Sequence, residues 1–463
     1  MRYVCALCIF ACMMTDPVGA WAQKNGQPPP AEKGSVVRLQ DTINATLRRS
    51  HSLKAIQENR VAVEEETRKA KAGWGPRVDV TARGGVNQLS NTTTRPLGDD
   101  TGFYGATSFG ATLIQPLWDG FATRSRVRSS EATLDSMTSR VFDNATTLAL
   151  DSIIAHIDVL RLRKILLLAS NNVNRHKEIL ASARDRASMG ADTVADVSQA
   201  EGRLSRALSS LEDARTKLLQ GDATYRRLTG MPVPPELEPV SLPAPMFVNP
   251  DAVLAVVEKH NPKLEAYLHD IRAAKGQKEL AESAYYPTVN LEAGPNHTNR
   301  AGNGEQWTTS LEVMGVLRWN VFNSGADVAG TRSAAAKERQ ARQNLYNLMD
   351  EIMLEVQTTW EGYQNALVQF KHYSDAIQYN TQTRDAYQEQ FYTGQRTLLD
   401  VLDAESELFN SSTQAATAAG NILVGGYKLY GLTGTLLAHL GIDAAPLLKQ
   451  PVGNDSAPIM RFK

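Results

Sequence analysis

Uninterrupted helical patterns occupy much of the chain. Residues 121–189 contain neither proline nor glycine, and residues 326–393 contain no proline. At about 1.5 Å per residue, a helix over either stretch would reach roughly 100 Å. A shorter helix-compatible stretch follows each one, over residues 192–229 and 396–433. The pattern of hydrophobic and polar positions therefore predicts two exceptionally long helical hairpins.

Each of the shorter helical stretches carries an apolar stripe with a seven-residue period. Its members are Val197, Leu204, Leu211, Leu218 and Tyr225 in the first stretch, and Val401, Leu408, Ala415, Ile422 and Leu429 in the second. A sustained stripe of this period is typical of a coiled-coil seam. An ordinary helical-bundle core would show the same period, so the stripe predicts close helix packing and leaves both arrangements open.

A different period appears in front of each long helix. Apolar and polar residues alternate over 76–88 and 103–117, and again over 287–294 and 306–322. Alternation with a period of two predicts strands with one apolar and one polar face. The sequence therefore predicts two β-hairpins and four strands. Strands of this length can cross a bilayer when they are tilted.

The two halves of the chain are copies of one unit. An offset of 204 residues superimposes the turn glycines Gly190 and Gly394, and also the aspartates Asp196 and Asp400. Further upstream the offset becomes 211, so the difference in length is confined to the stretch between. Each unit is predicted to begin with a helix, as over residues 39–71, and to continue with two strands and two long helices.

The duplication divides the chain into five predicted parts. They are an export signal (1–22), a first unit (23–230), a linker with seven prolines (231–250), a second unit (251–434) and a mobile tail (435–463). A period of about 200 residues indicates a duplicated domain rather than a short-repeat solenoid.

Charge and cysteine content narrow the class of protein. The chain has 463 residues and a formal net charge of -1, which argues against a dedicated nucleic-acid binder. All three cysteines lie in residues 1–22, where a short apolar core precedes a small-residue cleavage motif that ends at Ala22. Lipidation at Cys12 is the alternative, and either route exports the protein. After cleavage no cysteine remains for a disulfide or a metal site.

Four strands are too few to close a barrel. Open sheet edges are costly in hydrocarbon, so the chain must pool its strands with copies of itself. Three copies would supply twelve strands, enough for an aqueous lumen. Aromatic residues gather where strands meet helices, namely Trp74, Trp118, Phe121, Tyr285, Tyr286, Trp319 and Phe322. They would form an interfacial belt, although packing at strand ends is an alternative explanation.

The sequence resembles the TolC-like outer-membrane efflux and secretion channels from about residue 36 to residue 434. The most specific match is residues 394–404, and the strand-to-helix segment 115–120 and the Leu-Thr-Gly that closes each half also match. The resemblance implies an α+β membrane protein, in which a duplicated unit contributes four strands to a trimeric, 12-stranded outer-membrane β-barrel. A long α-helical coiled-coil tunnel would continue this barrel into the periplasm.

The same resemblance implies a passive exit duct for proteins or small molecules, with no enzymatic activity and no cofactor. It would act as a homotrimer with a periplasmic adaptor protein and an inner-membrane ABC or proton-driven transporter, in type I secretion or multidrug efflux. It would lie in outer-membrane lipid with most of the chain in the periplasm. The alternative function is that of a periplasmic coiled-coil adaptor or scaffold without a pore. This alternative would leave the predicted strands unexplained. An exported enzyme would need a catalytic constellation, and no such motif appears.

Candidate gate residues lie near the second turn. Asp400 and Asp403 are three positions apart and share a helix face. If three chains meet there, their carboxylates form an acidic ring that favours cations, while a solvated helix face is the plain alternative. The resemblance implies that this ring lines the constricted entrance and that Arg396 is a latch, for which Asp196 is the expected partner. Phe391 stands where the family has a tyrosine, so one latch hydrogen bond is expected to be missing.

The helix turns are the expected docking points for an adaptor. One exposed tip consists of Gly190, Ala191 and Asp192, and the other contains Gly394 and Gln395. An adaptor could pack its own hairpins against these tips.

Overall fold

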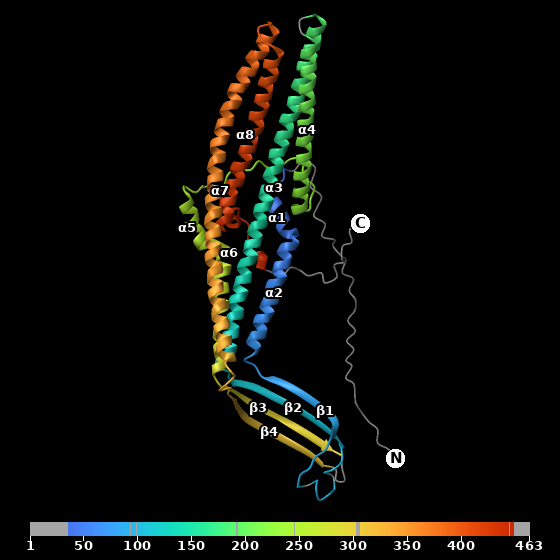
Figure 1. Cartoon of the computed structure of the whole chain (residues 1–463), viewed down its shortest axis with the longest axis vertical. Coiled ribbons are helices and arrows are strands. Elements are labelled where there is room, and N and C mark those ends of the chain that lie inside the picture. Colours follow the sequence, from blue (N-terminus) through green and yellow to red (C-terminus); the bar gives the residue numbers. More distant parts are fainter. Residues whose placement is uncertain are drawn as a thin grey trace, which may run out of the picture.

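The computed structural model is an elongated molecule with a sheet at one end and long helices that extend away from it (Figure 1). The described residues are 36–92, 94–98, 100–190, 193–244, 246–301, 306–443 and 445–448. The predicted export signal with its cysteines lies outside these residues, and so do Ala191 and Asp192 of the first predicted tip.

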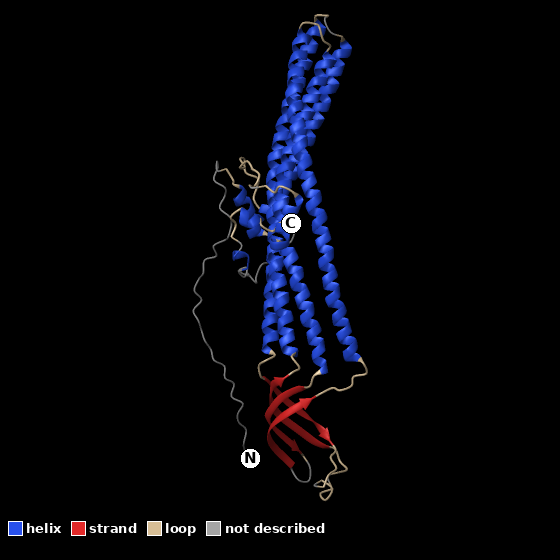
Figure 2. Ribbon diagram, turned by 90° about the vertical axis from the view of Figure 1, so that its left-hand side faces the viewer, coloured by secondary structure: helices blue, strands red, loops and turns tan. Residues whose placement is uncertain are grey.

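Four antiparallel strands form one sheet in the order β1-β2-β3-β4. They are β1 (Arg77–Asn87), β2 (Tyr104–Trp118), β3 (Thr288–Arg300) and β4 (Gln306–Arg318). Both predicted hairpins are present, and β2 pairs with β3 although long helices separate them in the chain. Within the described residues, β1 and β4 each leave one edge of the sheet without a strand partner. Figure 2 shows all four strands gathered below the helices.

The pairing register gives the sheet one apolar and one polar face. Leu113 on β2 stands opposite Ala293 on β3, which in turn stands opposite Val313 on β4. Leu113 and Val313 are exposed in the single chain. On the other face, Glu292 and Arg318 form an ion pair at 3.0 Å. The predicted alternation is therefore present, and it suits strands with lipid on one side and water on the other.

Strand β3 is longer than the sequence predicted. The expected end was residue 294, before Pro295, but the strand continues to Arg300. The pairing with β2 is interrupted at Gly294 and Pro295, where proline has no N–H to donate. Pro295 remains in register with Leu311 of β4, so the pairing with β4 carries the strand past it. Strand β4 is shorter than predicted, since it ends before residue 322.

Two long helical hairpins extend from the sheet. Helix α3 (Ala122–Ser188) turns back into α4 (Val194–Thr229), and α7 (Ala326–Tyr392) turns back into α8 (Leu398–Leu432). These bounds agree with the predicted helices to within two residues. Helix α3 is central to the packing, because it contacts α4 as well as α8 of the second unit. None of the helices in the described ranges has both the length and the apolar character of a membrane span.

The helix that opens each unit is divided into two. The elements are α1 (Leu39–Arg49) and α2 (His51–Ala72) in the first unit, and α5 (Pro250–His260) and α6 (Pro262–Glu282) in the second. The single helix predicted over 39–71 is therefore wrong at Ser50, whose Oγ accepts the Leu53 N–H at 3.2 Å and caps α2. Asn261, the equivalent of Ser50 at the offset of 211, caps α6 in the same way.

The predicted linker and the start of the predicted tail are packed parts of the fold. Leu237 of the linker is buried and forms a parallel bridge with Val37. The tail contributes α9 (Leu436–His439), where Leu436 is fully buried. Two short 3₁₀ helices, Ser283–Tyr285 and Ala445–Leu448, complete the described elements. Apolar side chains thus anchor the tail as far as residue 448, which corrects the expectation that all of it is mobile.

The aromatic residues at the strand–helix junctions are exposed. The exposed fraction of the seven predicted belt residues ranges from 40% at Trp118 to 83% at Phe322. Trp118 contacts Phe121 edge to face, and Trp319 donates its indole N–H to the Tyr285 carbonyl at 3.1 Å. This exposure argues against packing at strand ends and favours an interfacial belt.

Candidate gate at the helical tips

The tips of the two hairpins meet in a small hydrophobic cluster. Phe391 on α7 and Leu402 on α8 pack with Leu180 and Ala183 on α3 and with Ala200 on α4. The cluster belongs to one chain and forms without a second copy. Most of the candidate gate residues lie on or next to it.

Each hairpin turns at a glycine in the left-handed conformation. The φ angle is 76° at both Gly190 and Gly394. This conformation costs residues with a Cβ roughly 1–2 kcal/mol. A Cβ added at either glycine would have no atom within 4 Å. The neighbouring Gln395 is exposed, so the described parts of both tips are open surfaces.

Asp196 and Asp400, which the duplication aligns, each complete a capping box at the start of a helix. Thr193 donates its hydroxyl to Asp196 at 2.6 Å, and Thr397 donates its hydroxyl to Asp400 at 2.8 Å. The backbone N–H groups of the two threonines donate to the same carboxylates at 3.0 and 3.1 Å. These bonds, with the hydroxyl bond first, lower the pKa of both carboxyl groups. The two aspartates therefore have a structural role in addition to any role in the gate.

Asp403 is paired inside the chain. Arg203 on α4 donates from Nη2 to its Oδ1 at 2.5 Å. The Asp403 side chain is 55% exposed, so its carboxylate also reaches solvent. An arginine of the other hairpin thus compensates one of the two carboxylates predicted for the ring.

Arg396 pairs with Asp400 rather than with Asp196 among the described residues of one chain. Its Nη1 lies 3.8 Å from Asp400 Oδ1, and its Nε donates to Gln390 Oε1 at 3.2 Å. Its guanidinium carbon lies 4.3 Å from the centroid of the Tyr387 ring. A pairing with Asp196 therefore requires a second copy or a change in conformation.

Phe391 connects the two hairpins without a hydroxyl group. Its ring is buried, and the Arg186 guanidinium carbon lies 4.5 Å from the ring centroid. Arg186 Nη1 also donates to the Phe391 carbonyl at 3.3 Å. Arg186 is half-buried, so this cation–π contact is worth about 1 kcal/mol, between the values for exposed and desolvated pairs. Phe391 has no hydroxyl group, and these two contacts with Arg186 connect it to α3.

Some of the residues that form bonds at the tips could be predicted from the sequence, and others could not. The Thr-x-x-Asp pattern of a capping box occurs at both turns and could have identified Thr193 and Thr397. Arg186 and Arg203 had no such signal, because their partners lie 205 and 200 residues away in the chain. Within the described ranges, no group of three or more acidic or histidine side chains could hold a metal ion.

Comparison with known proteins identifies the family. The model of the outer membrane efflux protein family matches residues 42–231 and 253–435 in two segments, one over most of each predicted unit. The chain belongs to this family. Outer membrane efflux protein BepC of Brucella suis biovar 1 (strain 1330) is 26% identical over 404 residues, which cover 87% of this chain and 85% of the relative. Outer membrane protein TolC of Escherichia coli (strain K12) is 24% identical over 367 residues, covering 76% and 74%.

Solved structures show the same fold for this efflux-family chain. The outer membrane protein VceC of Vibrio cholerae matches with a TM-score of 0.73 and 17% identity, over 87% of this chain and 96% of that chain. The TolC-like fold class predicted from the sequence is confirmed, with four strands from each copy in a trimeric barrel and a long helical tunnel. The protein is an outer-membrane channel with a large periplasmic part. The alternative of a scaffold without a pore is set aside.

Proposed function

We propose that the protein is the gated exit duct of an export machine and that Asp400 and Asp403 line its inner entrance. The supporting observation is their position. They lie on α8 beside the turn, and the turns lie at the opposite end of the molecule from the sheet (Figure 1). Cargo that enters at the tips would pass along the helices before it leaves through the barrel.

The duct is passive, so another protein must supply the energy. We assign this role to an inner-membrane ABC or proton-driven transporter, which acts through a periplasmic adaptor in type I secretion or multidrug efflux. The cargo is a protein or a small molecule. The open surfaces at Gly190 and Gly394 support docking of the adaptor at the tips. Arg396 is partly exposed, and exchange of its 3.8 Å contact with Asp400 for Asp196 of a neighbouring copy would form a weak latch.

Replacement of Asp400 and Asp403 by asparagine tests the acidic ring. Thr397 still caps α8, and an asparagine at position 400 can still accept the Thr397 backbone N–H through its amide oxygen, so the change removes charge while it retains the start of the helix. In planar-bilayer recordings we expect the preference for cations to fall roughly tenfold and block by multivalent cations to weaken, because the focused negative potential is lost. Unchanged selectivity and block would show that these carboxylates are only a solvated helix face.

Two companion variants separate charge from closure. Glu212→Gln removes an exposed carboxylate from α4 far from the turn, and it should leave selectivity unchanged. Arg396→Ser retains the ring but removes the latch, so conductance should rise while the preference for cations stays.

Valine at Gly190 or Gly394 tests docking at the tips. A β-branched residue is strained at a φ of 76°, so the turn must change shape. We expect export in cells to fall at least tenfold, while the amount of trimer in outer membranes remains normal, since the tips are far from the barrel. The exposed Gly202 inside α4 provides the control, because its replacement by valine does not alter a turn. Full export by both tip variants would contradict docking at the turns.

A further inference from the structure

The acidic and arginine side chains of the four strands all lie on the polar face of the sheet. They are Arg77, Asp79, Arg83, Glu292, Arg300, Glu312 and Arg318. Four of them form two ion pairs inside one copy, Arg77 with Asp79 at 2.9 Å and Glu292 with Arg318 at 3.0 Å. Most of the charge on this face is therefore compensated before any second copy is present.

Two of the remaining charges, Arg83 on β1 and Glu312 on β4, have no partner of opposite charge in the single chain. Arg300 is different, because it is buried, donates from Nε to Asn87 Oδ1 at 3.1 Å and packs on the Tyr104 ring. Arg83 and Glu312 are both exposed, and neither forms an ion pair with another described residue of its own copy. One positive and one negative side chain are thus left on the polar face.

These two charges lie on the two open edges of the sheet. Strands β1 and β4 are its outermost strands, and Figure 1 shows them on opposite sides. A closed trimeric barrel has no open edge, so β1 of one copy must pair with β4 of the next. Because successive strands are antiparallel, β1 and β4 also run in opposite directions. The seam between copies is therefore an antiparallel pair, to which one copy contributes Arg83 and the next contributes Glu312.

The register inside one copy indicates how the strands must be staggered at the seam. Across the sheet, the pairing connects Arg77, the first residue of β1, through β2 and β3 to Met314 on β4. Met314 lies four residues before Arg318, where β4 ends. If Arg77 of the next copy stands opposite Arg318, the register advances by four residues from one copy to the next.

A stagger of four residues per copy suits a barrel of twelve strands. With a rise of about 3.3 Å per residue and about 4.8 Å between strands, it corresponds to a strand tilt of roughly 35°, which is usual for barrels. It also gives every residue of β1 a partner on β4. The stagger must be even, because an odd one would turn the polar face toward lipid. Two residues fewer would reduce the tilt to roughly 20°, and two more would leave the start of β1 beyond the end of β4.

In this register Arg83 of one copy stands directly opposite Glu312 of the next copy. Side chains that are directly opposite in an antiparallel pair have Cβ atoms about 4.5–5.5 Å apart, within reach of an ion pair. Arg77 and Arg318 also meet at the seam, but each already has an acidic partner in its own copy. The two unpaired charges are therefore the ones that the seam brings together.

We propose that Arg83 and Glu312 form an ion pair between neighbouring copies, which fixes the register of each barrel seam. The edge strands need such a mark, because Gly84 and Gly85 follow Arg83 on β1 and glycine-rich strands slip readily. A slip of two residues would retain the polar and apolar faces but would place Arg83 opposite another residue. Three such pairs would line the water-filled side of the barrel. The proposal uses the trimeric barrel alone and does not depend on a gate at the helical tips.

Reversal and exchange of the two charges test the pair. Arg83→Glu and Glu312→Arg each place like charges opposite one another at all three seams, which is destabilising. At the temperature where half of the wild-type trimer survives on denaturing gels, we expect the surviving fraction of either variant to fall roughly tenfold. The double variant restores opposite charges, so its surviving fraction should return to within about twofold of the wild type. Thr298→Glu is the control, because it adds charge to the polar face of β3, whose two neighbours belong to the same copy. It should retain the heat resistance of the wild type.

Disulfide formation between copies tests the register. All three cysteines of the chain precede residue 23, so introduced cysteines are the only ones on the strands. A chain with Arg83→Cys receives a second cysteine at Glu312, Ser310 or Met314, and the rate of oxidative cross-linking is followed on non-reducing gels. We expect Glu312→Cys to cross-link at least about tenfold faster than the other two, because only directly opposite residues bring their Cβ atoms close enough for a disulfide.

The outcomes decide the pair and its register separately. Wild-type heat resistance in both single variants would overturn the ion pair, and so would losses that add in the double variant instead of cancelling. If a single reversal prevents assembly altogether, recovery of trimer in the double variant supports the pair, and continued failure overturns it. The fastest cross-link at position 310 or 314 would overturn the register. None of these results changes the proposed role of the tips, which lie at the other end of the molecule.

Discussion

Leucine at Gly276 is expected to prevent assembly of the folded trimer. Gly276 lies on α6 where this helix crosses α3, and an added Cβ would lie 2.9 Å from the backbone N and Cα of Ser129. Backbone atoms cannot rotate away as a side chain can. The two helices must therefore move apart, at a cost of about 3 kcal/mol or more.

Polar bonds at the same crossing would be lost when the helices separate. Ser129 donates to the Ala273 carbonyl at 2.9 Å, and Gln277 donates to the Ser129 hydroxyl at 2.9 Å. Farther along the seam, Arg140 pairs with Asp270 at 2.6 Å. These bonds depend on the close approach that glycine permits.

The mobility of unheated samples on denaturing gels measures the effect of Gly276→Leu. We expect little or no heat-modifiable trimer, together with degradation of the monomer in cells. Gly202→Leu is the matched control, because Gly202 is an exposed helical glycine with no atom within 4 Å of an added Cβ. It should assemble normally. A Gly276→Leu trimer with wild-type thermal stability would show that the α3–α6 seam can adapt.

Mild acid is expected to destabilise the region where the linker crosses the helices, through His156. This histidine on α3 is fully buried. Its Nε2 lies 3.0 Å from the Glu238 carbonyl, which can only accept, so Nε2 carries the proton. Its Nδ1 lies 3.1 Å from the Thr42 hydroxyl, which also lies 3.1 Å from the hydroxyl of Tyr225. Neutral histidine satisfies this network when Tyr225 donates to Thr42 and Thr42 donates to Nδ1.

The direction of the pH effect follows from the pKa of His156. Burial lowers this pKa below its ordinary value, against a smaller opposing effect of the Glu238 carbonyl. As pH falls below about 6.5, the unfolded chain therefore takes up a proton before the folded chain does. The free energy of unfolding decreases from this pH down to the lower pKa of His156 in the folded state. The slope is at most about 1.4 kcal/mol per pH unit for each histidine. His176, whose pKa burial also lowers, acts in the same direction.

Thermal unfolding of the trimer between pH 8 and pH 5 measures this effect. The wild type should lose stability across the interval, and His156→Gln should be less stable at pH 8 but show a flatter pH profile. The exposed His51 is the control, since His51→Gln should retain the wild-type profile. Burial raises the pKa of Asp143, Asp151 and Asp158. The folded state therefore takes up these protons before the unfolded chain does, which favours the fold as pH falls further and opposes the effect of the histidines. An unchanged slope in a folded His156→Gln trimer would assign the acid effect to other groups.

The sequence by itself determined the element types, the duplication and the family. Helix and strand periods are local properties, so residues 121–189 and 326–393 revealed their helices without knowledge of any neighbour. The turns at Gly190 and Gly394 were equally local, because a left-handed φ favours glycine. Where a local signal was ambiguous, the prediction failed. The sequence predicts one helix through Ser50, where α1 and α2 divide, and a strand that ends before Pro295, where β3 continues to Arg300.

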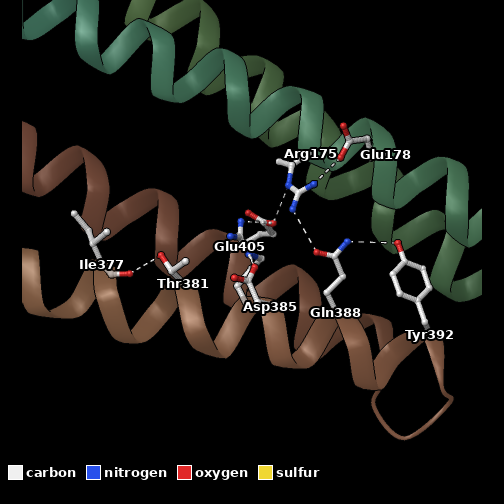
Figure 3. Close-up of polar contacts among 9 residues, drawn as sticks. Arg175, Glu178, Ile377, Thr381, Asp385, Gln388, Tyr392 and Glu405 are labelled. Atoms are coloured by element: carbon white, nitrogen blue, oxygen red, sulfur yellow. Dashed lines mark hydrogen bonds and ion pairs between the residues drawn. The ribbon is translucent and has the colours of Figure 1, made fainter.

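Only the tertiary structure decided which side chains pair at the hairpin tips. Asp403 was identified from the sequence, but its partner Arg203 is 200 residues away and belongs to the other hairpin. Glu405 on α8 gave no sign of burial in the sequence, because its cover comes from Arg175 on α3 and Arg384 on α7 together. Figure 3 shows Arg175 directed from its own helix toward Glu405 on the opposite hairpin. The position of a residue in the helical repeat determines which face of the helix carries its side chain. The packing of the helices determines which residues that face contacts. The hairpin tips were therefore predictable, whereas the bonds that hold them together were not.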